Sequence, residues 1–408
     1  MADEPRGQPR NASPRRRRAN RSWPRNWLRP VNWAPFAAIA LLLLSGTGAA
    51  PDQSSANWEA PAPRDRIRND QWHLRFLKTE AANAVSRGSG VIVAVLDTGV
   101  DRHPDLRRNL LVGTSTIPGS PGDGLLDRNS HGTGMAGLIA AHGQPNNKGA
   151  LGIAPDSKIL PVRSSGAANT GQADDLAAGI DYAIAHHAGV ISISSSGATS
   201  TKLVRAIQDA LSADIVVVAA AGNKPEDAYV GYPAEEPGVI AVGGVDRSGL
   251  HAPVSVSGPE IDVVAPAVDI YSTSYGGKYS KGTGTSSATA IVAGAAALIR
   301  SKYPHLPAAE VAHRLTATAV DKGPPGRDDE YGYGVIDLVA ALTADVPPIG
   351  FGSSGVTAPA STAAGPSGDG GGTARGFATL GVLLAAGGGY LVWRRRRRAG
   401  DPPPRISR

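Results

Sequence analysis

Residues 91–106 read VIVAVLDTGVDRHPDL, an apolar run that ends on an acidic residue. Strands that are buried on both faces of a parallel sheet are apolar throughout, and helices cover them on each side. Ligands bind beyond the carboxyl ends of such strands. The stretch therefore predicts an α/β fold with a mostly parallel central sheet, and it places the carboxylate of Asp97 where a site is expected.

The same pattern continues along the chain. Further apolar runs of strand length alternate with segments suited to helices, which predicts a three-layer arrangement of helices, sheet and helices. The expected strands are 91–96, 159–162, 190–194, 215–220, 239–243 and 262–265, and the expected helices are 133–141, 173–187, 202–212, 286–302 and 307–320.

Charge and cysteine content exclude several classes of protein. The 408 residues contain no Cys, which excludes thiolate nucleophiles, disulfides and Cys-ligated metals. The net charge of +6 comes from the ends, because 1–50 and 375–408 each carry +7 and leave −8 for 51–374. The Arg-rich segments lie at the two ends of the chain and are not expected to share one folded surface, so no nucleic-acid partner is expected.

The N-terminal 50 residues have the pattern of an export signal. An Arg-rich region precedes the short apolar run 36–44 and a stretch of small residues ending at Ala50. Charged, then apolar, then small is the order of a secretory signal peptide, so 1–50 is predicted to be one. An uncleaved anchor or a misassigned start codon remains an alternative. Residues 51–71 would form a short N-terminal extension.

The C-terminal region has the pattern of a membrane anchor. Residues 376–393 carry no charge and are followed at once by five Arg, so they predict a transmembrane helix with 394–408 as a basic cytoplasmic tail. The Gly-, Pro- and Ser-rich stretch 347–375 is typical of a linker. A Gly-rich tail or loop is the alternative. The chain would then be a single-pass protein of the cell membrane, with 72–346 as its extracytoplasmic domain.

Three residues suggest nucleophilic catalysis when they are taken together. Alone, Asp97 suits a strand-end cap or a metal ligand, His131 a structural role, and Ser286 a helix N-cap. A serine becomes a nucleophile when an imidazole takes its proton and a carboxylate fixes the imidazole's tautomer. The order Asp, His, Ser along the chain is that of subtilisin, and it differs from the orders in chymotrypsin and the α/β-hydrolases.

The segments around these residues resemble the subtilisin-like serine proteases of peptidase family S8. They are VIVAVLDTGV at 91–100, HGTGMAGLIA at 131–140 and GTS at 284–286, and the resemblance covers about 70–345. It implies a subtilisin-like fold and a catalytic triad of Asp97, His131 and Ser286. The segment VVVAAAGN at 216–223 implies that Asn223 donates to the oxyanion, together with the backbone N–H of Ser286.

The resemblance also indicates where a substrate binds. Ser194, Ser195 and Ser196 correspond to the family strand that pairs with the substrate backbone, and with Gly222 they would edge the pocket for the P1 side chain. Ser195 and Ser196 stand where the family usually has Leu and Gly, and Ser196 would crowd the pocket. Lys224 would lie at its rim, which motivates the hypothesis that an acidic or polar P1 side chain is tolerated.

Two further departures fall on the helix that begins at the nucleophile. Ala290 replaces the usual Pro, and Ser287 replaces the usual Met or Phe. Neither side chain transfers a proton. Altered helix packing with an intact triad is therefore expected.

The order of segments resembles the mycosins, membrane-anchored proteases associated with type VII secretion in actinobacteria. WHLRFLKTEAA at 72–82 is similar to their segment before the Asp block. The resemblance implies a protein or peptide substrate, the cell membrane and a type VII secretion complex as partners. A scaffold subunit without catalysis is the alternative. The stretch between Ala50 and this segment is too short for a separately folded prodomain, so none is expected.

No cofactor is expected. Asp105 and the loop 146–152 fall where many subtilisins bind structural calcium, but the loop looks shortened and carries Lys148. A solvated loop is favoured over a metal site. The remaining His residues show no metal-ligand spacing.

Overall fold

A computed structural model describes residues 66–166 and 171–349. The predicted signal peptide, the predicted span at 376–393, the tail at 394–408 and nearly all of the linker lie outside the described residues. Within the described part, no helix is long and apolar enough to cross a membrane.

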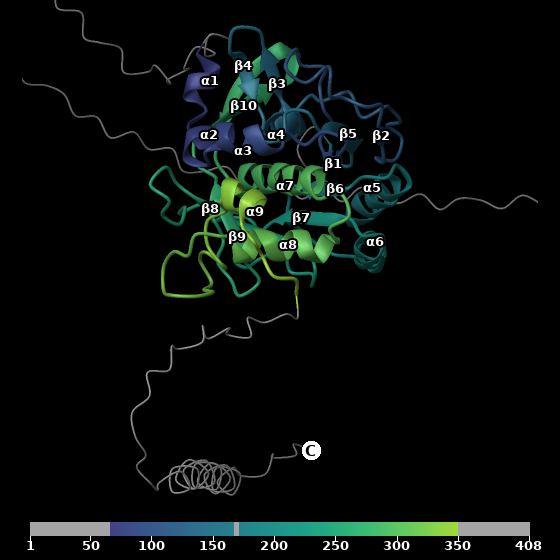
Figure 1. Cartoon of the computed structure of the whole chain (residues 1–408). Coiled ribbons are helices and arrows are strands. Elements are labelled where there is room, and N and C mark those ends of the chain that lie inside the picture. The colour runs from purple at the N-terminus through teal and green to yellow at the C-terminus, as the bar shows by residue number, and fades with distance from the viewer. Residues whose placement is uncertain (1–65, 167–170, 350–408) are drawn as a thin grey trace, which may run out of the picture. The chain divides into compact units, whose positions relative to one another are not determined.

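A seven-stranded sheet forms the centre of the domain (Figure 1). Every neighbouring pair of its strands is parallel. In spatial order the strands are β2 (Thr114–Ser115), β5 (Lys158–Arg163), β1 (Ile92–Asp97), β6 (Val190–Ile193), β7 (Val216–Ala220), β8 (Ile240–Val245) and β9 (Val263–Pro266). The predicted parallel sheet is confirmed, and each expected strand lies within two residues of its predicted bounds.

Helices cover both faces of this sheet. Successive side chains of a strand point to opposite faces, so Val93 and Val95 of β1 join one core and Ala94 and Leu96 the other. The first core packs against α4 (His131–Ala140), α7 (Thr285–Lys302), α8 (Ala308–Ala317) and α9 (Leu338–Thr343). The second packs against α5 (Ala173–Ala185) and α6 (Thr201–Ser212). Strands without a polar face are stable here because neither face meets water.

The order in which strands are added to the sheet reverses at β1, and this reversal creates a crevice. From β1 the chain builds β5 and β2 on one side, and it then crosses to build β6 and the later strands on the other. Loops beyond the carboxyl ends of β1 and β6 therefore diverge, which opens a binding crevice at this point of an α/β sheet. Asp97 ends β1, and Ser194 directly follows β6.

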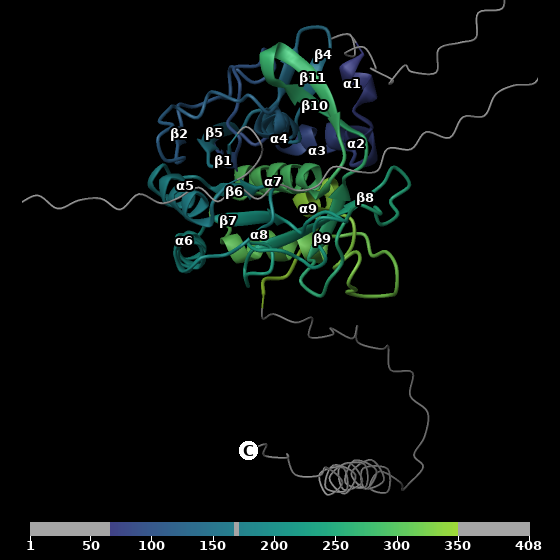
Figure 2. The same cartoon turned by 180° about the vertical axis from the view of Figure 1, so that it is seen from behind.

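Smaller elements surround this framework. They are α1 (Ile67–Asp70), α2 (Trp72–Phe76), α3 (Thr79–Val85) and two antiparallel pairs, β3 (His142–Gln144) with β4 (Lys148–Leu151) and β10 (Ile270–Ser274) with β11 (Lys278–Gly282). A 3-10 turn, Tyr275–Gly277, joins the second pair. This pair lies near α1, β4 and α4, as the rear view shows (Figure 2).

Two predicted boundaries differ from the structure. The folded domain begins before residue 72, because Ile67 is fully buried and the Gln71 amide bonds to both the N–H and the C=O of Leu151. The helix expected over 307–320 ends at Ala317. Val320 instead exchanges two backbone hydrogen bonds with Val335, so a tertiary pairing ends the helix three residues early.

Candidate active site

Asp97 and His131 form the centre of the crevice. Asp97 is the last residue of β1 and is almost fully buried. His131 Nδ1 lies 2.8 Å from Asp97 Oδ1 and 2.9 Å from Oδ2, and the backbone N–H of Thr98 donates to Oδ1 at 2.7 Å. A buried carboxylate costs free energy unless it is paired, and these contacts provide the partners. Because Nδ1 faces the carboxylate, Nε2 is left for a reacting group.

A glycine allows the helix that carries His131 to reach Asp97. Gly132 is so close to β1 that an added Cβ would lie 2.1 Å from the carbonyl oxygen of Gly99. Any side chain at this position would push the start of α4 away from the strand. The glycine after His131 therefore sets the distance between the imidazole and Asp97.

A second buried carboxylate, Asp127, organises the segment before His131. Its Oδ1 accepts hydrogen bonds from Thr98 Oγ1 and from the N–H groups of Asn129 and Ser130, at 2.8 to 3.1 Å. Its Oδ2 accepts from both the N–H and the hydroxyl of Thr133, in the first turn of α4. The sequence pattern did not predict this role of Asp127. An acidic residue four positions before a His that begins a helix is the signal that could have indicated it.

The carboxylates around His131 decide its charge. Burial lowers the pKa of His131, but the charge and hydrogen bond of Asp97, together with the charge of Asp127, outweigh burial and raise the pKa above the ordinary value. An imidazole with a raised pKa is a stronger base than a free one. The site therefore favours proton transfer to His131.

Ser286 is the second residue of α7 and lies in the same crevice. Its Oγ donates to the carbonyl oxygen of Ser194 at 2.8 Å, and Ser194 Oγ donates back to the Ser286 carbonyl at 3.2 Å. The triad prediction expects Ser286 Oγ to bond to His131 instead, and no such bond occurs among the described residues. Rotation about the Ser286 Cα–Cβ bond would exchange the Ser194 carbonyl for another acceptor.

Asn223 follows the loop after β7 and faces the start of α7. Its Oδ1 accepts from the N–H of Thr285 at 2.9 Å and from Thr285 Oγ1 at 3.2 Å. This pair of bonds fixes the amide plane and directs Nδ2 away from Thr285. In the described structure Nδ2 donates to no other residue, so an N–H donor is available next to Ser286.

The predicted substrate-binding residues lie on two neighbouring segments. Ser194, Ser195 and Ser196 extend from β6, and Gly222 extends from β7. Lys224 is exposed, as expected of a residue at a rim. The structure adds Asp227, which the sequence pattern did not indicate and whose Oδ2 accepts a hydrogen bond from Ser196 Oγ at 2.9 Å. Its neighbours in sequence carry no catalytic motif, so no pattern pointed to it.

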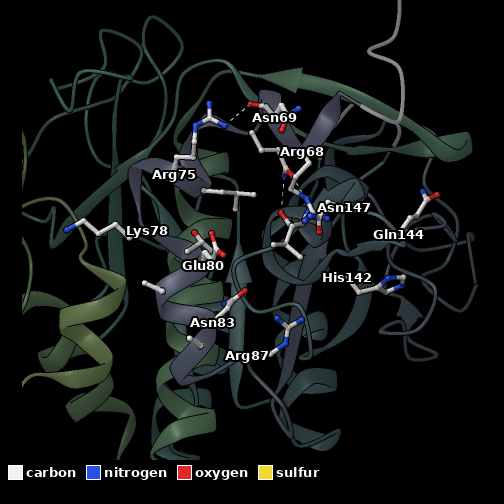
Figure 3. Close-up of a pocket in the computed structure, with 16 residues that line it drawn as sticks. Arg68, Asn69, Arg75, Lys78, Glu80, Asn83, Arg87, His142, Gln144 and Asn147 are labelled. Carbon is white, nitrogen blue, oxygen red and sulfur yellow. Dashed lines mark hydrogen bonds between the residues drawn. The ribbon is translucent and has the colours of Figure 1, made fainter.

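The described domain has one pocket beside the predicted catalytic residues and a larger pocket elsewhere. A pocket of about 390 Å³ lies next to His131 and Ser287. A larger one of about 1120 Å³ lies under α1 to α3, where Figure 3 shows Arg68, Asn83 and His142 around it. None of the residues predicted for catalysis lines the larger pocket. The larger pocket and the predicted catalytic residues therefore lie in different places.

Protein groups already bond to the residues of the candidate calcium site. Asp105 is fully buried, and its oxygens accept from Gln144 Nε2, from the N–H of Ala150 and from the hydroxyl of Tyr279. The Arg68 side chain donates to the carbonyl oxygen of Gly149 at 3.1 Å. Within the described ranges, no cluster of three or more acidic or His side chains could hold a metal. Absence of calcium stays a prediction.

Most of this domain is similar to known sequences. A profile of the Subtilase family, Peptidase_S8, matches residues 88–334. Subtilisin E of Bacillus subtilis (strain 168) is 44% identical over 259 residues, which are 62% of this chain and 66% of that protein. The chain thus spans just under two thirds of the length of this relative.

Solved structures add a more specific similarity. A crystal structure of MycP1 with the N-terminal propeptide removed superposes with a TM-score of 0.61 at 32% identity, covering 68% of this chain and 98% of that one. A crystal structure of MycP1 from the ESX-1 type VII secretion system gives a TM-score of 0.62 at 30% identity, covering 68% and 86%.

Proposed function

The chain belongs to the subtilase family of serine endopeptidases, and on this premise we propose that it is a membrane-anchored serine endopeptidase associated with type VII protein secretion. Its reaction is the hydrolysis of peptide bonds through Asp97, His131 and Ser286. The observation that carries the proposal is the contact of both Asp97 oxygens with His131 Nδ1, at 2.8 and 2.9 Å. That contact leaves Nε2 as the base for the serine.

The proposed reaction begins with proton transfer. His131 Nε2 takes the proton of Ser286, whose Oγ attacks the carbonyl carbon of the substrate, and the carbonyl oxygen becomes an oxyanion. Asn223 Nδ2 and the backbone N–H of Ser286 donate to that oxyanion. His131 then gives its proton to the leaving amine as the peptide bond breaks. Water, activated in turn by His131, releases the acyl group from Ser286.

The roles of the neighbouring residues follow from their contacts. Asp97 holds the imidazole in the tautomer that leaves Nε2 free, and it stabilises the cation formed during attack. Thr285 holds Asn223 so that Nδ2 faces the oxyanion. Before substrate binds, the carbonyl oxygen of Ser194 accepts a hydrogen bond from the Ser286 hydroxyl. Substrate binding would then be accompanied by rotation of the hydroxyl toward His131.

Labelling with a fluorophosphonate separates this proposal from the alternative of a non-catalytic scaffold. We expect the purified chain to be labelled on Ser286 and Ser286→Ala to lose the label. Absence of labelling in a folded sample would favour the scaffold. Ser274→Ala is a matched control, because this serine bonds to Ser130 near the site but has no proposed role in proton transfer.

The membrane and secretion parts of the proposal depend on other observations. The similarity to MycP1 of a type VII secretion system supports the secretion context. The uncharged stretch 376–393 and the Arg that follow it support a single membrane span with a cytoplasmic C-terminus. We expect extracellular protease to digest the domain in intact cells and to spare a C-terminal epitope tag. Digestion of the tag would refute this topology.

No cofactor is part of the proposed chemistry. We expect a chelator to leave peptidase activity and the melting temperature unchanged, because Arg68 and Asp105 are bonded to protein groups in the region where a calcium ion would bind. A fall in melting temperature with chelator that calcium reverses would show that calcium binds.

A further inference from the structure

The pocket beside His131 is the feature that the proposed reaction leaves unexplained. It has a volume of about 390 Å³, within the range of pockets that bind small groups. Eleven residues line it, from the loop before α4, from α4 itself, from β10 and β11, and from the start of α7: Asn129, Ser130, His131, Gly134, Met135, Leu138, Ile270, Ser272, Ser280, Gly282 and Ser287.

The position of the pocket identifies the part of the substrate that reaches it. In acyl transfer the imidazole gives its proton to the leaving amine, so the residue after the scissile bond, P1′, lies on the His131 side of the nucleophile. His131 and Ser287 line this pocket, and neither Asn223 nor Ser194 does. The pocket is therefore on the side of the leaving group and away from the oxyanion donors.

The lining of the pocket selects the chemistry of its occupant. Met135, Leu138 and Ile270 form an apolar base, and each is at least nine-tenths buried. The hydroxyl of Ser272 already donates to the carbonyl oxygen of Gly134 at 2.7 Å. No Asp, Glu, Lys or Arg lines the pocket, so a charged side chain would lose its hydration without gaining an ion pair.

Two small residues keep this space open. An added Cβ at Gly282 would meet only Ser287 Oγ, at 3.9 Å. Its φ lies outside the left-handed region, so a side chain can be added there without backbone strain. Ser287 is the residue that replaces the larger Met or Phe expected at the position after the nucleophile. A larger side chain at either residue would fill the pocket from its rim.

We propose that this pocket binds an apolar P1′ side chain of the substrate, of about the size of Leu or Phe. The proposal rests on the proposed peptidase function and adds a substrate preference to it. Apolar pockets discriminate by roughly 10- to 200-fold for each methylene that they bury or exclude. We expect about 10-fold or greater preference for Leu over Gly at P1′, and lower rates for Asp and Lys than for Leu.

The test uses quenched peptides that differ only at P1′, with cleavage sites confirmed by mass spectrometry. We expect Gly282→Leu to reduce the Leu-to-Gly ratio of kcat/KM by about 10-fold, because the new side chain occupies the pocket. Gly122→Leu is a matched control, since its added Cβ also meets little, with only Ser115 at 4.0 Å, and it does not line the pocket.

The outcomes distinguish this inference from the proposed function. Equal rates for Leu and Gly at P1′ in the unmodified protein, or an unchanged ratio in Gly282→Leu, would overturn the inference alone. If the protein is not labelled by the fluorophosphonate and cleaves none of the peptides, the proposed function is overturned as well. If Gly282→Leu fails to fold, Ser287→Met provides a second way to fill the same space.

A different set of contacts concerns the P1 side chain, on the other side of the nucleophile. Asp227 Oδ2 accepts hydrogen bonds from Ser196 Oγ at 2.9 Å and from the N–H of Asn223 at 2.8 Å. Ser196 extends from β6 and Asn223 from β7, so these bonds form a polar bridge between the two segments that edge the P1 pocket.

The bridge fills space that a P1 side chain would need. An added Cβ at Gly222 would lie 2.7 Å from Asp227 Oδ2, and one at Gly231 would lie 2.8 Å from the Cβ of Ser196. Both glycines therefore contact the bridge directly. Ser196 therefore lies against Gly231 and Asp227 lies against Gly222, so both side chains occupy space between the two segments.

From this bridge we infer, again on the premise of the proposed peptidase function, that P1 is restricted to small side chains such as Ala and Ser. The Asp227 carboxylate also opposes the acidic P1 residue that Lys224 suggests from the sequence. We expect at least about 10-fold higher kcat/KM for Ala than for Phe at P1. Ser196→Gly combined with Asp227→Ala should raise cleavage after Phe relative to Ala by a similar factor.

Peptides that vary only at P1, with Leu fixed at P1′, test this. Cleavage after Phe as fast as after Ala would overturn the inference, and so would a preference for Lys, which would show Asp227 pairing with the substrate. Ser196→Gly alone removes one end of the bridge and keeps the Asp227 bond to Asn223, in case the double variant does not fold. Fluorophosphonate labelling that persists in each variant shows that the peptidase function itself is intact.

Discussion

Two buried histidines in this domain have opposite surroundings. His131 at the start of α4 contacts both oxygens of Asp97, and its pKa is raised. His73 on α2 is fully buried, neither ring nitrogen has a hydrogen-bond partner in the described structure, and burial lowers its pKa to about 3. The contrast shows that burial alone lowers the pKa of a histidine, whereas contact with a carboxylate can outweigh burial and raise it.

The largest expected effect comes from breaking the carboxylate contact of His131. Asp97→Asn keeps the shape of the side chain but offers an amide where the imidazole needs an acceptor, so it favours the wrong tautomer. We expect kcat to fall by about 10⁴-fold, the magnitude known for this change in another serine protease. Steady-state hydrolysis of a quenched peptide measures it.

The control for this variant is Asp156→Asn, which removes an exposed carboxylate bonded to Arg87. Its kcat should match that of the unmodified chain. A fall of less than about 10-fold in Asp97→Asn would mean that His131 does not act as the base.

A second way to weaken the proposed active site is to remove the Asn223 amide. Asn223→Ala leaves the oxyanion with the backbone N–H of Ser286 alone. We expect kcat to fall by about 10²- to 10³-fold with little change in KM, a magnitude known from subtilisin itself. A change confined to KM would assign Asn223 to substrate binding instead.

Thr285→Val separates the amide's orientation from its presence. This variant removes the hydroxyl that bonds to Asn223 Oδ1 and keeps the backbone N–H bond. It should lower kcat by less than Asn223→Ala does.

The sequence predicted those parts of the site that depend on local pattern. Asp97 ends an apolar strand, His131 begins a helix and is followed by Gly132, and Ser286 lies in the first turn of a helix that follows Gly284, so chain order and element type predicted them. Asp127 and Asp227 were missed because each acts through hydrogen bonds made by an irregular loop, which carry no periodicity. The Ser286 bond to Ser194 was missed for a related reason: it depends on a side-chain torsion that a sequence does not specify.

The fold shows the same division. Continuous apolar runs predicted six of the seven parallel strands within two residues, because burial on both faces demands such runs. The exception is β2, whose two residues are polar and half-buried. The short helices before residue 85 and the β10–β11 pair were not predicted. Their residues are stabilised by distant partners, such as the bond from Trp72 Nε1 to the carbonyl oxygen of Val268, and a window of local sequence does not contain those partners.

Replacing His73 should make the domain more stable at acidic pH. A folded-state pKa of about 3 against 6.5 when unfolded means that the unfolded chain takes up a proton that the folded chain refuses. The free energy of unfolding therefore decreases by up to about 1.4 kcal/mol per pH unit as the pH falls from 6.5 toward 3. His73→Leu removes this loss. Between pH 6.5 and 4 its free energy of unfolding should therefore fall by about 3 kcal/mol less than that of the unmodified chain.

Urea unfolding at each pH measures this effect. His305→Leu is the control, because it makes the same substitution at an exposed histidine. If His73→Leu lost stability with falling pH as steeply as the unmodified chain, His73 would not be the group responsible.

The smallest expected effect sharpens the comparison at His131. Asp127 raises the pKa of His131 through its charge without touching the ring. Asp127→Asn removes that charge, so the pKa of His131 should fall toward its ordinary value. In the proposed reaction His131 must be neutral to accept the Ser286 proton, so we expect activity to rise as the pH increases through this pKa. The acidic limb of kcat/KM should therefore move to lower pH in the variant.

A pH profile of kcat/KM separates this electrostatic effect from a structural one. Loss of the hydrogen bonds that Asp127 accepts would lower the plateau of the profile but would not displace its acidic limb. Asp246→Asn is the matched control, because Asp246 also accepts backbone N–H bonds in a loop but faces a turn at residues 248–250. A limb that stays in place, or moves to higher pH, would mean that Asp97 alone accounts for the raised pKa. The difference in pKa between His131 and His73 would then come from the contact with Asp97 and not also from the charge of Asp127.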